Sequence, residues 1–340
     1  MTITKLLVSA PWLHGHLRQV KVLDCSWHLP MVKRSASSEF TKAHIPTAQF
    51  FDIDEIKDLA RADLPHMLPP AEFFATAMDR FGIASNDHVV VYDSAGVGPA
   101  CRVFWTFHTM GHNRVSVLNG GLPAWIAHGY ETEAGACSSS VTGADKATEA
   151  AHQSKGGNNE SARLPLYCAQ PQPDLVCSYA DIVGNIEQLK ASSGHSGRQI
   201  IDARPNPRFT GQAPEIRPGL SSGHMPHAIS VPSSEVVTVT TASEATGKDS
   251  KTEAQSKMSS ASDAATVQVL KSPEQIRATF EAAGVDLGRP ITTTCGSGVT
   301  AAVLYFALLN AGVPRENLTL FDGSWTEYAL NPSSEIVKGA

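Results

Sequence analysis

The stretch Thr292-Thr293-Thr294-Cys295-Gly296-Ser297-Gly298-Val299-Thr300 guides the interpretation of the whole chain. Its threonines are β-branched and favour a strand, and the two glycines after Cys295 allow the backbone to turn sharply. The residues from about Thr300 to Leu309 are apolar on most faces, as in a buried helix. The stretch therefore predicts a buried strand, a tight loop and a helix.

This arrangement would place Cys295 in an unusual environment. Backbone N–H groups of the loop, and the positive end of the helix dipole, would point toward its sulfur. Such surroundings favour the thiolate, which is the reactive form of cysteine. Most cysteines are buried structural residues, but the strand, loop and helix around Cys295 favour a nucleophile.

Length and composition limit the classes of function. The 340 residues are enough for two domains. A net charge of −6 without a basic cluster argues against nucleic acid as a direct partner. No apolar run approaches the ~20 residues of a membrane span, so no membrane partner is expected. Residues 1–14 lack a basic region followed by a long apolar core, so a cytoplasmic location is expected and a mitochondrial one is possible.

The six cysteines are irregularly spaced and include no Cys-x-x-Cys pair. This spacing fits neither a zinc site nor a disulfide framework, and it favours a reducing compartment.

The second half of the chain repeats the first, which indicates an internal duplication. Strands alternate with helices in both halves, which predicts an α/β fold with mainly parallel sheets and helices on both faces. Asp93 stands in the first half where Cys295 stands in the second, so only the second half is expected to be catalytic. The main strands are expected at 20–24, 89–93, 115–118, 199–204 and 291–295.

This repeat predicts a non-catalytic domain at 1–132, a linker at 133–175 and a catalytic domain at 176–340. Two stretches, at about 133–163 and about 238–266, are rich in small and polar residues. They contain too few large apolar residues to offset the entropy of ordering, so we expect disordered insertions there.

The loop Cys295-Gly296-Ser297-Gly298-Val299-Thr300 resembles the active-site loop of the 3-mercaptopyruvate sulfurtransferases, a branch of the rhodanese superfamily. The resemblance covers nearly the whole chain outside the two insertions and implies two tandem rhodanese-like domains. It also implies that Gly296, Gly298, Val299 and Thr300 line the substrate site. In the sister branch, the thiosulfate sulfurtransferases, two cationic residues follow the cysteine.

Three arginines match substrate-binding positions of that family. Arg208 and Arg217 lie in a segment, 204–217, that resembles its substrate loop. A guanidinium fork suits a carboxylate beside a ketone, because it binds two oxygens at once. Arg102 matches an arginine that faces the substrate across the cleft, although the usual preceding proline is absent. Arg204 is interpreted as a structural ion-pair residue.

The resemblance also implies a Ser–His–Asp relay beside the thiol, made of Ser297, His66 and Asp54. His66 begins a His-Met-Leu-Pro segment, and Asp54 ends a Phe-Asp-Ile-Asp segment. The spacing between these two residues is one residue longer than the family pattern. Such a relay would orient the histidine and deliver a proton to the pyruvate enolate as sulfur leaves.

The expected function is transfer of sulfur from 3-mercaptopyruvate, through a Cys295 persulfide, to a thiol acceptor such as thioredoxin or to cyanide. Pyruvate is released, and neither a metal nor an organic cofactor is expected. Two alternatives remain open: thiosulfate:cyanide transfer, and a persulfide carrier that relays sulfur to a protein partner, for example toward tRNA thiolation. A phosphatase loop would need arginine where this chain has Ala301.

Overall fold

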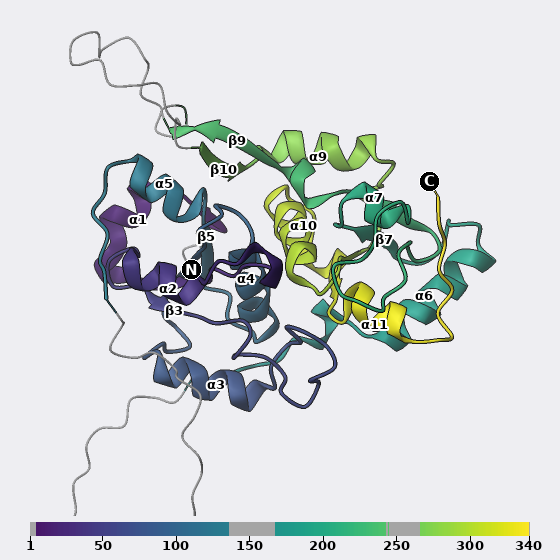
Figure 1. The fold of residues 1–340 in the computed structure, drawn as a ribbon, viewed down its shortest axis with the longest axis horizontal. Coiled ribbons are helices and arrows are strands. Elements are labelled where there is room, and N and C mark those ends of the chain that lie inside the picture. The colour runs from purple at the N-terminus through teal and green to yellow at the C-terminus, as the bar shows by residue number, and fades with distance from the viewer. Residues whose placement is uncertain (1–4, 136–166, 243, 245–265, 340) are drawn as a thin grey trace, which may run out of the picture.

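The computed structural model describes residues 5–135, 167–242, 244 and 266–339. These residues form two five-stranded sheets with the same strand order, one in each half of the chain. All strands within each of these sheets pair in parallel. Helices flank both sheets (Figure 1). The predicted α/β fold with two related units is therefore confirmed.

The first sheet has the order β1–β5–β4–β2–β3. Its central strand β4 is wholly buried, as a parallel strand covered on both faces should be. The strands are β1 (Leu7–Val8), β2 (Lys21–Asp24), β3 (Gln49–Phe50), β4 (Val89–Tyr92) and β5 (Val115–Leu118). The helices of this half are α1 (Ala10–His16), η1 (Leu17–Gln19), η2 (Pro30–Val32), α2 (Ala36–Lys42), α3 (Ala71–Arg80), α4 (Pro99–Thr109) and α5 (Gly121–Ala127).

The second sheet has the order β6–β12–β11–β7–β8. Its central strand β11 is a buried run of Ile and Thr, and the Thr292 hydroxyl lies 2.9 Å from that of Thr319 on the next strand. The strands are β6 (Val176–Cys177), β7 (Gln199–Asp202), β8 (Ala228–Ser230), β11 (Ile291–Thr294) and β12 (Leu318–Phe321). The helices are η3 (Pro173–Leu175), α6 (Tyr179–Ala191), α7 (Asn206–Phe209), η4 (Ser233–Val236), α9 (Pro273–Ala282), α10 (Val299–Asn310), η5 (Arg315–Asn317) and α11 (Ser324–Leu330).

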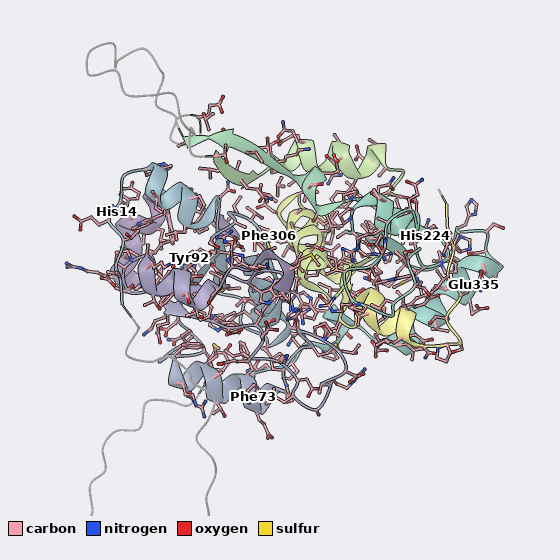
Figure 2. The ribbon with its side chains drawn as sticks, in the orientation of Figure 1. His14, Phe73, Tyr92, His224, Phe306 and Glu335 are labelled. Atoms are coloured by element: carbon pink, nitrogen blue, oxygen red, sulfur yellow. The ribbon has the colours of Figure 1, made fainter. Side chains whose placement is uncertain are left out.

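The helices that follow the two central strands, α4 and α10, pack against each other between the sheets. Every residue of α4 is buried, and its Phe104 ring lies 4.8 Å from Phe306 of α10. Phe306 is labelled near the centre of Figure 2. The mostly apolar sequence of both helices is explained by this position, because each faces its own sheet and the opposite half.

A third, two-stranded sheet corrects one sequence prediction. β9 (Val237–Thr241) and β10 (Thr266–Leu270) form an antiparallel pair at the two edges of the stretch expected to be disordered. Thr238 and Thr266 are therefore ordered, because alternating β-branched residues bury Val237 and Val267. Residues 243 and 245–265 lie outside the described residues. Figure 1 shows this hairpin extending from the second half toward α5 of the first.

The described residues of the predicted linker 133–175 make contacts with the first half at two places. Glu133 exchanges two backbone hydrogen bonds with His44, so the first half continues past residue 132. After residues 136–166, which the structure does not describe, the Tyr167 N–H donates to Asp79 of α3 at 2.6 Å. Residues 133–135 and 167–172 therefore pack on the first half, whereas η3 (Pro173–Leu175) contacts β12 of the second half.

Candidate active site

The Cys295 loop lies at the carboxyl end of β11, directly before α10. Cys295 is 2% exposed, and its N–H donates to Oγ of Ser324 at 3.3 Å. Its carbonyl oxygen accepts the N–H of Trp325 at 2.9 Å. The loop is thus held against the start of α11. Gly298 closes it with φ of 81°, a left-handed conformation that favours glycine.

Arg208 and Arg217 both lie beside Gly296. A methyl group added to Gly296 would lie 3.2 Å from Nη2 of Arg208 and 3.9 Å from Nη1 of Arg217. The absence of a side chain at Gly296 therefore allows two guanidinium groups to approach the residue after the thiol. The structure brings together the three residues that the sequence predicted as nucleophile and anion-binding pair.

Glu215, which the sequence analysis missed, holds Arg208 in place and joins it to Arg204. Its carboxylate accepts from Nη1 of Arg204 at 2.7 Å, and both Nε and Nη2 of Arg208 donate to its other oxygen. Arg204 also pairs with Asp202 at 2.6 Å and lies over the Trp325 ring. Arg204 is therefore a structural ion-pair residue, as expected. The only sequence signal for Glu215 was its place between Arg208 and Arg217.

Arg217 has no carboxylate partner among the residues that the structure describes. Its one hydrogen bond there is a long contact of 3.5 Å from Nη1 to Oγ1 of Thr326. Burial lowers the pKa of the Arg217 guanidinium, whereas a charge on Cys295 opposes that shift. A partly buried cation without a counter-ion is a site that an anion would stabilise.

Arg102 reaches the same loop from α4 of the first half. Its Nη2 lies 2.6 Å from Oδ1 of Asp322 and also donates to the carbonyl oxygen of His66. Its buried Nη1 has no hydrogen-bond partner among the described residues. A methyl group at Gly298 would lie 2.6 Å from that atom, so Arg102 is directed at the loop.

Asp54 and His66 lie side by side in the first half. Nδ1 of His66 is 3.2 Å from Oδ1 of Asp54, an ion-pair distance without the alignment of a hydrogen bond. Burial lowers the pKa of His66, and His66 in turn lowers the pKa of Asp54. Trp27, also missed by the sequence analysis, donates from Nε1 to Asp54 at 2.7 Å and packs edge-on against His66.

Ser297 is buried in the loop, but its hydroxyl makes no hydrogen bond to another described residue. The structure therefore brings Asp54 and His66 together without joining Ser297 to them by a hydrogen bond. The remaining loop positions, Val299 and Thr300, begin α10.

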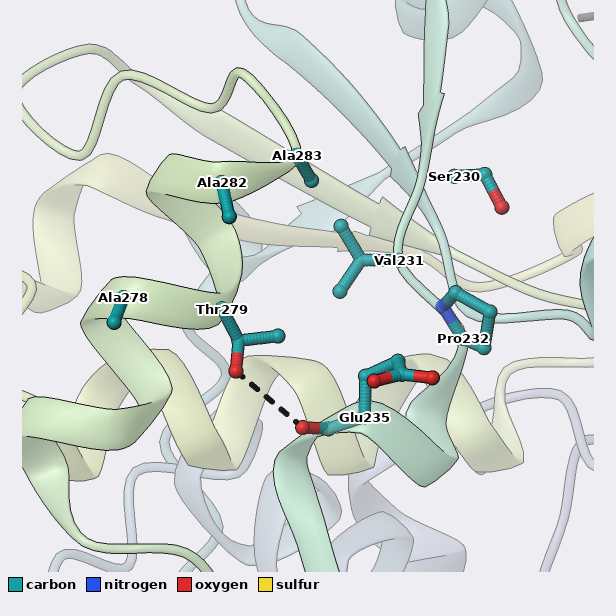
Figure 3. A pocket seen from close by; sticks show the side chains of 8 residues that line it. All are labelled: Ser230, Val231, Pro232, Glu235, Ala278, Thr279, Ala282 and Ala283. Atoms are coloured by element: carbon teal, nitrogen blue, oxygen red, sulfur yellow. Dashed lines mark hydrogen bonds between the residues drawn. The ribbon is translucent and has the colours of Figure 1, made fainter.

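A cavity of about 440 Å³ lies between the halves beside this site. His66 and Asp54 line it from one half and Arg217 from the other, with Trp27 and Met31 among its apolar walls. A second pocket, of about 500 Å³, lies between α9 and the residues after β8 and includes none of the predicted site residues (Figure 3).

The first half contains the matching loop, with Asp93 where the second has Cys295. The Asp93 carboxylate is 1% exposed and accepts four backbone hydrogen bonds of 2.7–3.0 Å from its own loop. The donors are Ala95, Gly96, Gly98 and Ala100. These backbone donors favour a negative group at the first residue of the loop, whereas burial raises the pKa of the Asp93 carboxyl.

Among the described residues, no cluster of three or more His, Cys, Asp or Glu could hold a metal ion. The five cysteines in this part of the chain are free thiols. No helix in the same part is long and apolar enough to cross a membrane.

Comparison with known proteins identifies the family. The rhodanese-like domain model matches residues 9–128 and again residues 185–331. This chain belongs to the rhodanese family. The two matches contain all strands of the two parallel sheets except the edge strands β1 and β6, and they confirm the predicted tandem architecture.

Relatives of this rhodanese-family chain are sulfurtransferases. An Arabidopsis thaliana protein named thiosulfate/3-mercaptopyruvate sulfurtransferase 1, mitochondrial, is 36% identical over 97% of this chain and 77% of its own length. Human 3-mercaptopyruvate sulfurtransferase is 32% identical over 98% of this chain and 95% of its own. The structure of SseA from Escherichia coli, described as a 3-mercaptopyruvate sulfotransferase, has a TM-score of 0.68 and 30% identity over 95% of this chain and 99% of its own. The predicted enzyme class is therefore confirmed.

Proposed function

We propose that this rhodanese-family enzyme takes sulfur from 3-mercaptopyruvate, carries it as a persulfide on Cys295 and passes it to a thiol. The observation that carries the proposal is the position of Arg208 and Arg217 beside Gly296, directly after the cysteine. A thiol next to two guanidinium groups suits a donor whose sulfur and carboxylate lie a few bonds apart. The names of the relatives support the same substrate.

The substrate carboxylate would bind at Arg217, whose guanidinium has no counter-ion among the described residues. Arg208 would contribute from the other side of Gly296, with Glu215 fixing its orientation. Arg102 would offer its unpartnered Nη1 from the opposite half. These contacts would place the substrate sulfur at the Cys295 thiolate.

The first chemical step is attack of the Cys295 thiolate on the substrate sulfur. A sulfur–sulfur bond forms and the sulfur–carbon bond breaks, and its electron pair passes to the methylene carbon. The product is the enolate of pyruvate, which takes up one proton and leaves. Ser297 would supply that proton and recover it through His66, whose orientation Asp54 and Trp27 maintain.

In the second step an acceptor thiolate attacks the outer sulfur of the persulfide and restores Cys295. Thioredoxin or a small thiol would serve, and cyanide would yield thiocyanate. A reducing compartment such as the cytoplasm would supply reduced acceptors. The cavity lined by His66 and Arg217 would give the acceptor access from the boundary between the halves.

Thiosulfate is a second candidate donor, because one observation favours it. The loop residues Gly296 and Ser297 carry no charge, but three arginines surround the loop from outside. Those guanidinium groups would stabilise a compact dianion without cations in the loop itself. The Arabidopsis relative is named for both donors.

The deciding experiment measures kcat/KM for 3-mercaptopyruvate and for thiosulfate with the same acceptor. We expect 3-mercaptopyruvate to be preferred, with one pyruvate released per sulfur transferred. Preference for thiosulfate would overturn the donor assignment and leave Cys295 as the sulfur carrier. A stable Cys295 persulfide with negligible turnover on small thiols would favour a carrier that delivers sulfur to a protein partner.

A further inference from the structure

Asp322 lies in the catalytic half, directly after β12, but its carboxylate contacts the other half. Oδ2 accepts the backbone N–H of Leu68 at 2.7 Å, and Oδ1 lies 2.6 Å from Nη2 of Arg102. Asp322 is 4% exposed and Arg102 is 2% exposed. Removing one partner of a buried charge pair leaves the other charge buried and unpaired, which destabilises the folded protein.

Both contacts of Asp322 lead to His66. Leu68 is two residues further along the chain, and the Nη2 group of Arg102 also donates to the carbonyl oxygen of His66. His66 itself has φ of 59°, a left-handed conformation that a non-glycine residue keeps only when its surroundings impose it. Asp322 thus holds, directly and through Arg102, the backbone that carries the imidazole.

The duplicated half offers an internal comparison. Asn119 directly follows β5 as Asp322 follows β12, and its Oδ1 accepts the backbone N–H of Leu270 from the opposite half at 2.9 Å. Leu68 and Leu270 precede α3 and α9 by the same number of residues. In each half, the residue after this strand therefore holds a segment of the other half.

The two versions of this contact differ where the chemistry differs. Counting back equally from Leu68 and Leu270 places Gln268 where the other segment has His66. The backbone of Gln268 covers Gly96 in the loop of Asp93. The contact next to Cys295 and His66 uses the Asp322 carboxylate, which pairs with Arg102. The matching contact next to Asp93 uses the amide of Asn119 instead.

We propose that Asp322 is a positioning residue that fixes His66 relative to the Cys295 loop when the two halves dock. The proposal rests on the proposed function, because it assigns His66 to proton transfer. Cys295 is held separately by Ser324 and Trp325, so loss of the Asp322 carboxylate should move His66 more than the thiol.

The test is a double-mutant cycle on the full chain with 3-mercaptopyruvate as donor. Asp322→Asn keeps an acceptor for the Leu68 N–H and loses the charge, so we expect kcat to fall about tenfold. Asp322→Ala should lower kcat about a hundredfold, which is the lower end of the range for general acid–base catalysis. In a His66→Ala background, Asp322→Ala should cost less than about threefold, because interacting residues are not additive. An equal loss in both backgrounds would overturn the proposal.

Two further measurements separate the possible causes of a lower kcat. Hydrogen exchange of the Leu68 amide should speed up in Asp322→Ala, which removes the acceptor, and unchanged protection in that variant would also overturn the proposal. Glu327→Gln is the matched control, since Arg61 and Glu327 form another ion pair between the halves at 2.9 Å. This variant should keep kcat within about twofold.

Failure of the proposed function would be recognised separately, because the wild-type chain would then release no pyruvate from 3-mercaptopyruvate. The isosteric Asp322→Asn variant keeps the proposal testable if Asp322→Ala does not fold. In an active wild type, full activity in Asp322→Asn together with unchanged Leu68 exchange would refute the positioning role alone.

Discussion

Oδ1 of Asp54 lies 3.2 Å from Nδ1 of His66, and both residues belong to the half of the chain that lacks the reactive cysteine. Cys295, Arg208 and Arg217 come from the other half. The candidate site is therefore complete only when the two halves are docked.

Cys295→Ser should abolish pyruvate release, because a hydroxyl cannot carry the transferred sulfur. Mass spectrometry of the wild-type protein after donor alone should show one added sulfur on Cys295. Cys168→Ser is the control, since Cys168 is an exposed thiol away from the loop, and it should keep full activity. Added sulfur on the Cys295→Ser protein together with turnover would contradict the mechanism.

Arg217→Lys should lower kcat/KM for 3-mercaptopyruvate by about 10- to 100-fold, because a lysine cannot reproduce a bidentate contact worth roughly 1.5–3 kcal/mol. If Arg217 binds the substrate carboxylate equally well in the ground state and in the transition state, steady-state kinetics should show a higher KM and little change in kcat. Arg80→Lys, at an exposed position on α3, is the control. Unchanged KM and kcat in Arg217→Lys would remove this residue from the substrate site.

Gly298→Ala should lose both stability and activity. Its φ of 81° costs about 1 kcal/mol for alanine, and the new methyl group would lie 2.6 Å from Nη1 of Arg102. Gly312→Ala separates these effects, because Gly312 has φ of 85° with nothing within 4 Å of an added methyl group. Thermal unfolding should detect a loss in both variants, whereas sulfur transfer should fall only in Gly298→Ala.

His108 should make stability depend on pH. Burial lowers its pKa from 6.5 to about 3, with Arg315 and His112 adding to the shift. Between these values the unfolded chain binds the extra proton and the folded chain does not. The free energy of unfolding therefore falls as pH falls through this window, by at most about 1.4 kcal/mol per pH unit from this group.

His108→Phe should remove this contribution, which urea unfolding between pH 6.5 and pH 4 would measure. The His108 ring already packs against Phe104, with 4.3 Å between the ring centroids, and neither ring nitrogen has a hydrogen-bond partner among the described residues. Burial raises the pKa of Asp24 to about 6, which gives an opposite slope, so the variant must be compared with the wild type. Equal slopes in the two proteins would contradict the assignment.

The sequence was informative where function depends on neighbouring residues. The Cys295 loop, the strand before it, the helix after it and the Arg208–Arg217 segment are each local, and the structure brings them together. Trp27 and Asp322 were missed, because each acts through residues that only the folded chain brings near. Glu215 was missed although its partners Arg204 and Arg208 are close in the chain, because the sequence does not show which arginine a carboxylate in this segment contacts. Trp27 and Asp54, for example, are 27 positions apart in the chain.

The hairpin of β9 and β10 was also missed, for a different reason. The composition of the stretch between them suggested disorder throughout, and this signal outweighed the short alternating patterns at its ends. Val267 becomes buried only by packing within this hairpin and near Gly120 of the opposite half. The local sequence gives almost no indication of such a contact.

The filled loop around Asp93 limits how this protein could acquire a second reaction centre. Exchanging Asp93 for a cysteine would supply a thiol, but the backbone of Gln268 on β10 would still cover the loop at Gly96. A second reaction centre would require both the loss of the Asp93 carboxylate and the movement of the hairpin, which belongs to the opposite half, away from this loop. Since the hairpin belongs to the half that carries Cys295, moving it away from the Asp93 loop would also disturb the half that holds the Cys295 loop.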